Sequence, residues 1–180
     1  DQELKIQIDK NLYEQEVVIV QSTSKPSNDH LMELLLIADT AKRSGAKRIT
    51  ALIPYFGYSR QDRHSYNYGP ISASLVARLI EASGVDKVIT MDLHSKQSEG
   101  FFKSVIKNID PIPLFIPFLK NEKYTIVSPD IGGISRARSL SGYLKTDLAV
   151  INKSRNFDGT CIMSEVIGDV RGKKCILIDD

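Results

Sequence analysis

The sequence predicts an α/β fold with parallel sheets, and three features of its 180 residues indicate it. Short apolar runs rich in β-branched residues alternate with amphipathic helical patterns, the order typical of parallel strands joined by right-handed crossovers. The pattern restarts after Pro111 and Pro113, which predicts a second α/β unit. Polar residues follow several of the apolar runs directly, and open α/β sheets bind ligands at that edge. We expect helices on both faces of the sheet.

The first half of the chain contains four predicted strands and two predicted helices. Residues 4–8 alternate apolar and polar side chains, as a half-exposed strand does, whereas 16–21 has the composition of a strand buried on both faces. Each helix has an apolar stripe and ends at a glycine, and Asn28 or Asp29 is the expected cap of the first. The predicted strands are 4–8, 16–21, 48–53 and 87–91, and the helices extend to Ser44 and from Ile71 to Ser83.

The second half repeats this alternation with shorter elements. The predicted strands are 124–128, 148–151 and 174–178, and the predicted helices are 112–119 and 132–144. We expect a domain boundary near residue 110.

The composition excludes several classes of protein. A net charge of +2 argues against bulk nucleic-acid binding, and no apolar run approaches the length of a membrane span. Cys161 and Cys175 lie in apolar sequence without C-x-x-C spacing, so we expect buried thiols in a reducing compartment. The chain starts without Met and stops directly after an apolar strand, so both ends are expected to be cuts through a larger protein.

Asp92 and His94 follow the predicted strand 87–91. A carboxylate and an imidazole at a strand end suit a hydrated divalent cation or a phosphate–metal complex. The alternative is a polar turn in which Asp92 caps the next segment.

The long loop 55–70 carries the charged run 60–64. The guanidinium groups of Arg60 and Arg63, with an amide between them, can grip phosphate oxygens and read the edge of a base. The nearby aromatic residues at 55, 56 and 58 either stack on a base or anchor the loop. A solvated charge cluster remains the alternative.

Three further junctions carry polar groups after apolar strands. The segment 128–133 offers Asp130, which could take a metal or a sugar hydroxyl, and a Gly-Gly helix start that an anion could approach. A mobile basic loop beginning at 153–155 suits stabilisation of charge that develops in phosphoryl transfer. Asp179 and Asp180 could hold two sugar hydroxyls or a metal. For each junction the alternative is an ordinary turn or strand end that binds no ligand.

Taken together, these segments resemble the ribose-phosphate pyrophosphokinase family, also called phosphoribosyl pyrophosphate synthetases. The resemblance extends over essentially the whole chain, and 92–102 looks like the family's signature. The matching segments are 28–35, 53–63, 92–102, 128–137, 151–155 and 178–180.

The resemblance implies two phosphoribosyltransferase-like parallel-sheet domains, both incomplete in this segment. These would be an N-terminal ATP-binding domain at 1–110 and the first part of a ribose 5-phosphate-binding domain at 111–180.

The activity that the resemblance implies is that of a Mg²⁺-dependent transferase of nucleotide biosynthesis in the cytoplasm. Such an enzyme moves the β,γ-diphosphoryl group of ATP to the anomeric hydroxyl of ribose 5-phosphate, which yields phosphoribosyl pyrophosphate and AMP. The resemblance also implies a homo-oligomer, a hexamer built from dimers, and no nucleic-acid or membrane partner.

The same resemblance implies a role for each matching residue. Lys153 and Arg155 would stabilise the transferring group from a catalytic flexible loop, and Asp179 and Asp180 would open the loop that binds ribose 5-phosphate. The remaining residues are the metal-binding pair His94 and Asp130, the ATP contacts Arg60, Gln61 and Arg63, and Asp1 and Glu3, which reach adenine from a neighbouring subunit.

Two other functions are open at this point. The family also contains a non-catalytic synthetase-associated protein, but retention of Lys153, Arg155, His94 and Asp130 together favours the enzyme. A phosphoribosyltransferase would share the Asp-Asp strand end, but not the charged loop 60–63. Because the Gly/Thr-rich phosphate loop expected after Asp180 is missing, we expect the 180 residues alone to be inactive.

Overall fold

The computed structural model describes residues 3–64, 68–155 and 161–180, without the side chains of 153–155 and 161–164. It divides into two compact units, Asp1–Asp110 and Pro111–Asp180. Each unit is a sheet with helices packed on it, which confirms the predicted α/β class.

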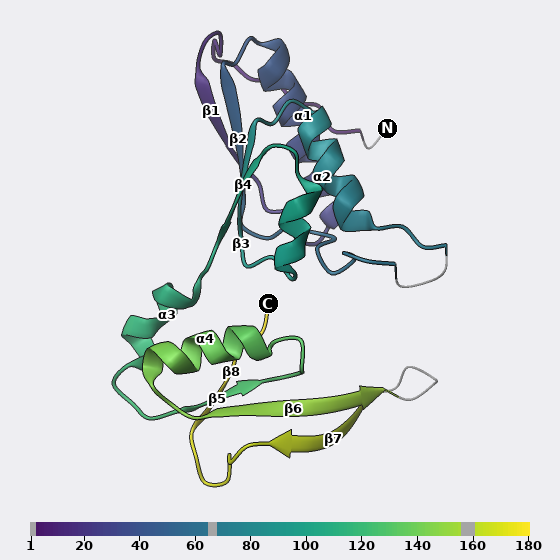
Figure 1. Cartoon of the computed structure of the whole chain (residues 1–180). Coiled ribbons are helices and arrows are strands. Elements are labelled where there is room, and N and C mark those ends of the chain that lie inside the picture. The colour runs from purple at the N-terminus through teal and green to yellow at the C-terminus, as the bar shows by residue number, and fades with distance from the viewer. Residues whose placement is uncertain (1–2, 65–67, 156–160) are drawn as a thin grey trace. The chain divides into compact units, whose positions relative to one another are not determined.

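Unit 1 contains a four-stranded parallel sheet in the order β1-β2-β3-β4 (Figure 1). The strands run in register, so all four carboxyl ends lie at one edge. The strands are β1 (Glu16–Val20), β2 (Arg48–Ile53), β3 (Lys87–Met91) and β4 (Val105–Ile109), and the helices are α1 (Ser27–Arg43), α2 (Ser72–Ala82) and the 3₁₀-helix η1 (Lys96–Phe101).

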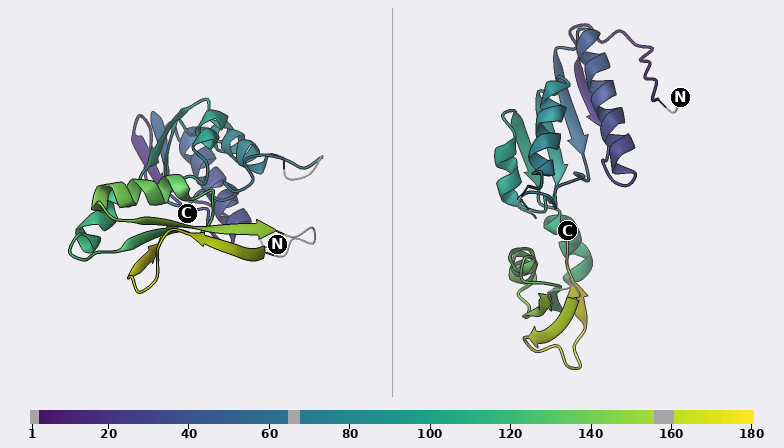
Figure 2. Two further views of the ribbon diagram at one scale, coloured as in Figure 1. Left: turned by 60° about the horizontal axis from the view of Figure 1, so that its bottom comes forward. Right: turned by 90° about the vertical axis from the view of Figure 1, so that its right-hand side faces the viewer.

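The helices of unit 1 pack on one face of this sheet, where α1 and α2 lie side by side (Figure 2). On β2, Ile49, Ala51 and Ile53 face the helices and are fully buried. On the opposite face of β1, Val18 and Val20 are 62% and 65% exposed. The prediction of helices on both faces is therefore wrong for the described residues, because right-handed crossovers between neighbouring strands in a constant direction keep every helix on the same side.

Several predicted details of unit 1 differ from the structure. Residues 4–8 form no strand, since an alternating pattern makes a strand only where a partner strand supplies hydrogen bonds. The strand β1 is not buried on both faces, as Val18 and Val20 show. The strand β4 was not predicted, because its run Val-Ile-Lys-Asn-Ile includes two consecutive polar residues.

Unit 2 contains a smaller, mixed sheet in the order β7-β6-β5-β8. The strand β5 is parallel to β6 and β8, whereas β7 is antiparallel to β6. Its core is the apolar contact of α3 and α4 with β5. The elements are α3 (Ile112–Leu119), β5 (Thr125–Ser128), α4 (Ile134–Leu144), β6 (Leu148–Arg155), β7 (Cys161–Ile167) and β8 (Cys175–Leu177).

The hairpin of β6 and β7 corrects the sequence analysis. Lys153 and Arg155 lie within β6, paired with Met163 and Cys161, and not in a loop that begins after residue 151. Polar residues extend the strand here because an antiparallel partner supplies backbone hydrogen bonds whatever the side chains are. Cys175 is exposed, not buried, since β8 is an edge strand of the described sheet.

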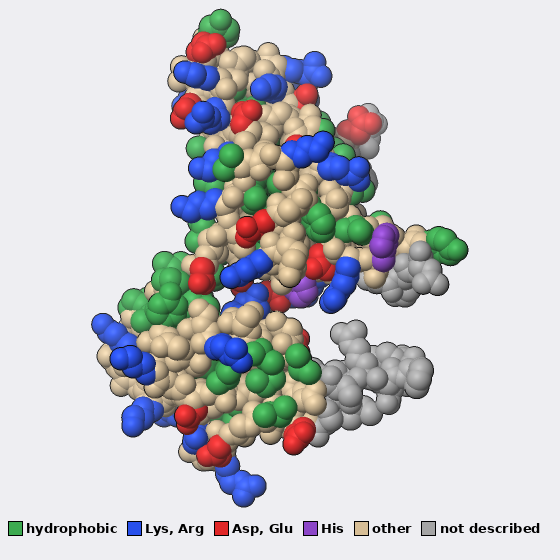
Figure 3. All heavy atoms as spheres, viewed as in Figure 1, with side chains coloured by type: hydrophobic (Ala, Val, Ile, Leu, Met, Phe, Trp, Pro, Cys, Tyr) green, Lys and Arg blue, Asp and Glu red, His purple; other side chains and the backbone are tan. Residues whose placement is uncertain are grey.

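The surface of unit 2 carries apolar side chains over α3, visible in green in Figure 3. Leu114, Phe115 and Phe118 are 61%, 51% and 81% exposed.

Across the described ranges, every helix is too short or too polar to cross a bilayer.

Candidate functional site

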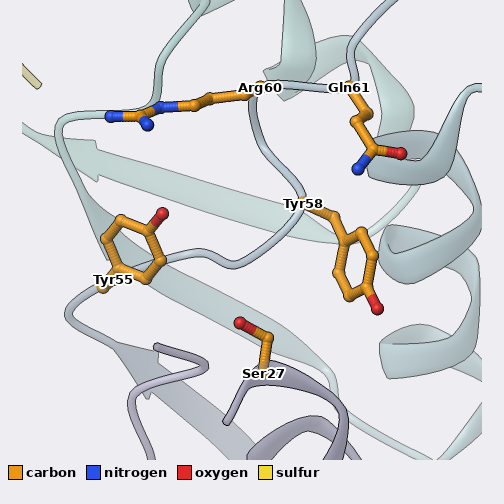
Figure 4. Close-up of a pocket in the computed structure, with 5 residues that line it drawn as sticks. All are labelled: Ser27, Tyr55, Tyr58, Arg60 and Gln61. Carbon is orange, nitrogen blue, oxygen red and sulfur yellow. The ribbon is translucent and has the colours of Figure 1, made fainter. Parts of the chain in front are cut away.

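A pocket of about 280 Å³ lies at the carboxyl ends of β1 and β2. Four of its five lining residues come from the loop after β2, and the fifth comes from the first turn of α1 (Figure 4). The lining residues are Ser27, Tyr55, Tyr58, Arg60 and Gln61. The pocket therefore occupies the sheet edge where parallel α/β folds bind ligands.

Thr23, in the loop after β1, fastens the loop after β2. Its hydroxyl accepts a hydrogen bond from Gly57 N at 2.6 Å and donates to Tyr55 O at 3.0 Å, and its own N–H donates to the same carbonyl at 3.0 Å. Thr23 is 2% exposed, so these bonds form away from water. A Cβ on Gly57 would lie 2.4 Å from Thr23 O, so the loop approaches too closely for any side chain there.

The three aromatic residues of this loop have different roles. Phe56 is 3% exposed and packs edge-on against Phe102, with ring centroids 5.7 Å apart, so it anchors the loop to the segment after η1. Tyr55 lines the pocket and is 45% exposed. Tyr58 also lines the pocket, has a left-handed backbone with φ 65°, and donates its hydroxyl proton to Asn28 Oδ1 at the start of α1.

The pocket unites two of the three predicted loop contacts to ATP. Arg60 and Gln61 both line it, with the Arg60 guanidinium on the side of Tyr55 and the Gln61 amide beside Tyr58 (Figure 4). Arg63 is not among the described lining residues: it forms an ion pair with Asp62 at 3.8 Å and is strongly exposed.

The turn after β3 presents His94 at the same sheet edge. Asp92 adopts a left-handed backbone with φ 45° and donates its N–H to Ile109 O at 3.0 Å. Leu93 N donates to Asn108 Oδ1 at 3.2 Å, and the amide of Asn108 donates in turn to Glu99 Oε1 at 3.2 Å. The turn is therefore built on β4, the strand that the sequence analysis missed, and His94 is exposed at its end.

In unit 2, Asp130 follows β5 and folds back on its own turn. Its Oδ1 accepts a hydrogen bond from Gly133 N at 2.9 Å, and Ser128 Oγ donates to Asp130 O at 2.7 Å. Asp179 and Asp180 follow β8, which is parallel to β5 and adjacent to it. The three predicted carboxylates of unit 2 therefore lie at one edge of its sheet.

The described residues contain no group of three His, Cys, Asp or Glu side chains placed to hold a metal ion. The predicted metal-binding pair is split between the units, with His94 in the first and Asp130 in the second. Of the two, the Asp130 carboxylate is the kind of ligand that Mg²⁺ takes in proteins, since Mg²⁺ keeps several waters and binds through one or two carboxylates together with substrate phosphates.

The structure gives less information on the other predicted site residues. Glu3 is exposed and outside regular structure. Asp1 lies outside the described residues, as do the side chains of Lys153 and Arg155. Sequence reasoning did not single out Ser27 as a pocket residue, although it starts a helix directly after a strand-end loop, which is the signal that could have found it.

Comparison with known proteins places the chain in one family. Residues 1–84 match the model of the "N-terminal domain of ribose phosphate pyrophosphokinase". The whole chain is 48% identical to a protein of Bradyrhizobium diazoefficiens and 50% identical to one of Agrobacterium fabrum, both named ribose-phosphate pyrophosphokinase. It spans 58% and 59% of the length of these two relatives.

A solved structure agrees in fold. The crystal structure of phosphoribosylpyrophosphate synthetase from Mycobacterium smegmatis superposes with a TM-score of 0.90 at 36% identity, over 99% of this chain and 59% of that one. Because sequence and fold agree over essentially its whole length, this chain belongs to the ribose-phosphate pyrophosphokinase family.

Proposed function

We propose that the protein is a ribose-phosphate diphosphokinase, which makes phosphoribosyl pyrophosphate and AMP from ATP and ribose 5-phosphate. The observation that carries this proposal is the pocket of unit 1, which unites a guanidinium, an amide and two tyrosines at the carboxyl edge of a parallel sheet. These groups suit a purine nucleoside triphosphate.

Each side of the pocket suits one part of ATP. Arg60 provides a planar cation for the phosphate oxygens. Tyr55 and Tyr58 offer aromatic surface for the base, and Gln61 offers an amide for its edge. Arg63 and, from a neighbouring subunit, Asp1 and Glu3 would complete the binding of ATP in the assembled protein.

Unit 2 supplies the acceptor in this proposal. Asp179 and Asp180, at the end of β8, would accept hydrogen bonds from the ribose hydroxyls of ribose 5-phosphate. Lys153 and Arg155 lie in β6, beyond the part of that strand that pairs with β5, and would bring positive charge to the same edge.

The anomeric hydroxyl oxygen attacks the β-phosphorus of ATP and forms a new P–O bond. The bond from that phosphorus to the oxygen bridging the α- and β-phosphates breaks, AMP leaves with the electron pair, and the hydroxyl proton passes to solvent. Lys153 and Arg155 stabilise the negative charge that develops on the transferring group. His94 and Asp130 would hold Mg²⁺, which would neutralise charge on the phosphates.

The alternatives make different demands on the same residues. A non-catalytic associated protein would form no product, although it could keep the ATP pocket. A phosphoribosyltransferase would bind phosphoribosyl pyrophosphate without needing Arg60 or Gln61. Both bacterial relatives are named as pyrophosphokinases, which favours the enzyme, and a hexamer built from dimers is the assembly that we propose with it.

Calorimetric titration of the whole protein with ATP and with ribose 5-phosphate separately tests the proposal. We expect Arg60→Ala and Gln61→Ala to weaken ATP binding by about tenfold each, since each removes hydrogen bonds to the ligand, and to leave ribose 5-phosphate binding nearly unchanged. The exposed Arg43, paired with Asp39 on α1, provides the control Arg43→Ala. Equal loss for both ligands would overturn the assignment of the pocket. A wild type that forms no AMP when both substrates are present together would overturn the proposed activity.

A further inference from the structure

Gln61 is held at three points, two of them on the first turn of α2. Its N–H donates to Tyr58 O at 2.9 Å, and its carbonyl accepts from Ala73 N at 3.1 Å. Its side-chain Oε1 accepts a hydrogen bond from Ser72 Oγ at 2.6 Å. Ser72 is 8% exposed, so the bond to the side chain is sheltered from water that could replace it.

In the structure the amide oxygen is the end bonded to Ser72, so the NH₂ group is the end turned away from α2. Figure 4 shows the Gln61 oxygen turned toward the helix and its nitrogen turned toward Tyr58. The amino end of a helix carries partial positive charge, which favours the amide oxygen on that side and the NH₂ group on the other. Ser72 therefore leaves Gln61 with hydrogen-bond donors, and no acceptor, toward a ligand.

We propose that Ser72 is a positioning residue that makes Gln61 a donor to an unprotonated ring nitrogen of adenine. This inference rests on the proposed function. The base is the part of ATP in question because an amide matches the hydrogen-bonding edge of a base, whereas the Arg60 guanidinium matches phosphate oxygens and extends to the other side of the pocket (Figure 4). A ring nitrogen that carries hydrogen, or a C–H in its place, would leave the amide donor without a partner.

The inference predicts a change in selectivity when Ser72 is replaced. Without the hydroxyl, the amide can rotate and present either its oxygen or its nitrogen to the ligand. The site is then no longer selective for a base with a hydrogen-bond acceptor at that position. A residue that served the fold alone would affect ATP and its analogues equally. The ratio of affinities therefore separates positioning from a general structural role.

The test measures binding of ATP and of its 1-deaza, 3-deaza and 7-deaza analogues, each of which replaces one ring nitrogen by C–H, to the whole protein. We expect one analogue to bind the wild type about tenfold more weakly than ATP, the size of one lost hydrogen bond. In Ser72→Ala this difference should fall to about twofold, as expected for an amide free to turn.

Two further variants keep the test decisive. Ser72→Thr retains a hydroxyl and should restore most of the wild-type difference. Ser74→Ala, at a neighbouring serine of α2, should behave as the wild type. Thermal unfolding of each variant shows whether α2 remains folded.

The outcomes distinguish this inference from the proposed function. If the wild type binds no ATP, the proposed function fails. If it binds ATP but treats all three analogues like ATP, or if Ser72→Ala keeps the wild-type ratio, the positioning role is wrong and the proposed function stands.

Discussion

The two units hold their strand-end residues in different ways. In unit 1, the loop after β2 is bound by residues distant in sequence: Gly57 bonds to Thr23, 34 positions away, and Tyr58 to Asn28, 30 positions away. In unit 2, Asp130 is held by Ser128 and Gly133, two and three positions away. The pocket of unit 1 therefore depends on the tertiary structure, whereas the turn of unit 2 is made locally.

The cores beneath these loops differ as well. The loop of unit 1 lies over a core that includes Ile19, Ile53 and Phe56, and Phe56 belongs to the loop itself. The core of unit 2 contains fewer buried residues among those described, chiefly Ile112, Ile126 and Leu140. A disturbance in the core of unit 1 should thus reach its pocket, while the turn at Asp130 should be less sensitive.

The largest effect is expected at Lys153, which belongs to neither kind of loop because it lies in β6. In the whole protein, Lys153→Ala should lower kcat by about 100- to 1,000-fold, or about 3–4 kcal/mol, because a cation facing developing charge acts mainly in the transition state. The KM for ATP should change little. Steady-state kinetics check this, with exposed Lys123→Ala as the control. An unchanged kcat with a raised KM would rule out the proposed role.

Thr23→Val should destabilise the protein by up to about 3 kcal/mol and weaken ATP binding, because it leaves Gly57 N–H buried without this acceptor. The matched change in unit 2 is Ser128→Ala, which removes a bond within one turn and should cost about 1 kcal/mol without affecting ATP. Urea unfolding and nucleotide titration measure both. If Ser128→Ala weakens ATP binding as much as Thr23→Val, the distinction between the two loops is lost.

Two glycines sharpen the same contrast. Gly57→Ala should cost about 1–2 kcal/mol, because its Cβ would collide with Thr23 O and push the loop outward. Gly142 lies in α4, and a Cβ added there would meet open space, so Gly142→Ala should stabilise unit 2 by up to about 1 kcal/mol through helix propensity. Thermal unfolding should give shifts of opposite sign, and shifts of the same sign would contradict the expectation.

The smallest effect concerns Glu81 on α2. Desolvation by partial burial raises its pKa, but hydrogen bonds from Ser104 and Lys103, two of them at 2.6 Å, outweigh this and hold the pKa below its usual value. A lowered folded-state pKa means that its stabilisation is present above the unfolded pKa and is lost as pH falls through the folded value.

Glu81→Gln should therefore cost about 1 kcal/mol at pH 7, and the cost should shrink as pH falls below about 4. In unit 2, Glu122 pairs with Lys174 on the surface, and Glu122→Gln should have almost no effect at either pH because exposed ion pairs are screened by water. Urea unfolding at both pH values checks this. A cost for Glu81→Gln that is independent of pH would contradict the assignment to charge.

The sequence alone determined the elements whose patterns are local. Three elements were predicted within a few residues of their bounds: α1, β2 and the short helix α3. Their periodicity depends only on residues close together in the sequence. Arg60 and Gln61 were singled out by the same local reasoning, since a charged loop after a buried strand indicates the ligand-binding edge, and both line the pocket of unit 1. Their contact with ATP stays a prediction.

Only the tertiary structure decided the rest. It placed the described helices of unit 1 on one face, formed β4 and β7 where the sequence is partly polar, and put Lys153 in a strand. It also separated Phe56, which anchors the loop, from Tyr55, which lines the pocket. These features depend on hydrogen bonds and packing between residues far apart in the chain. A local sequence pattern does not show which distant segment a strand or loop will pair with.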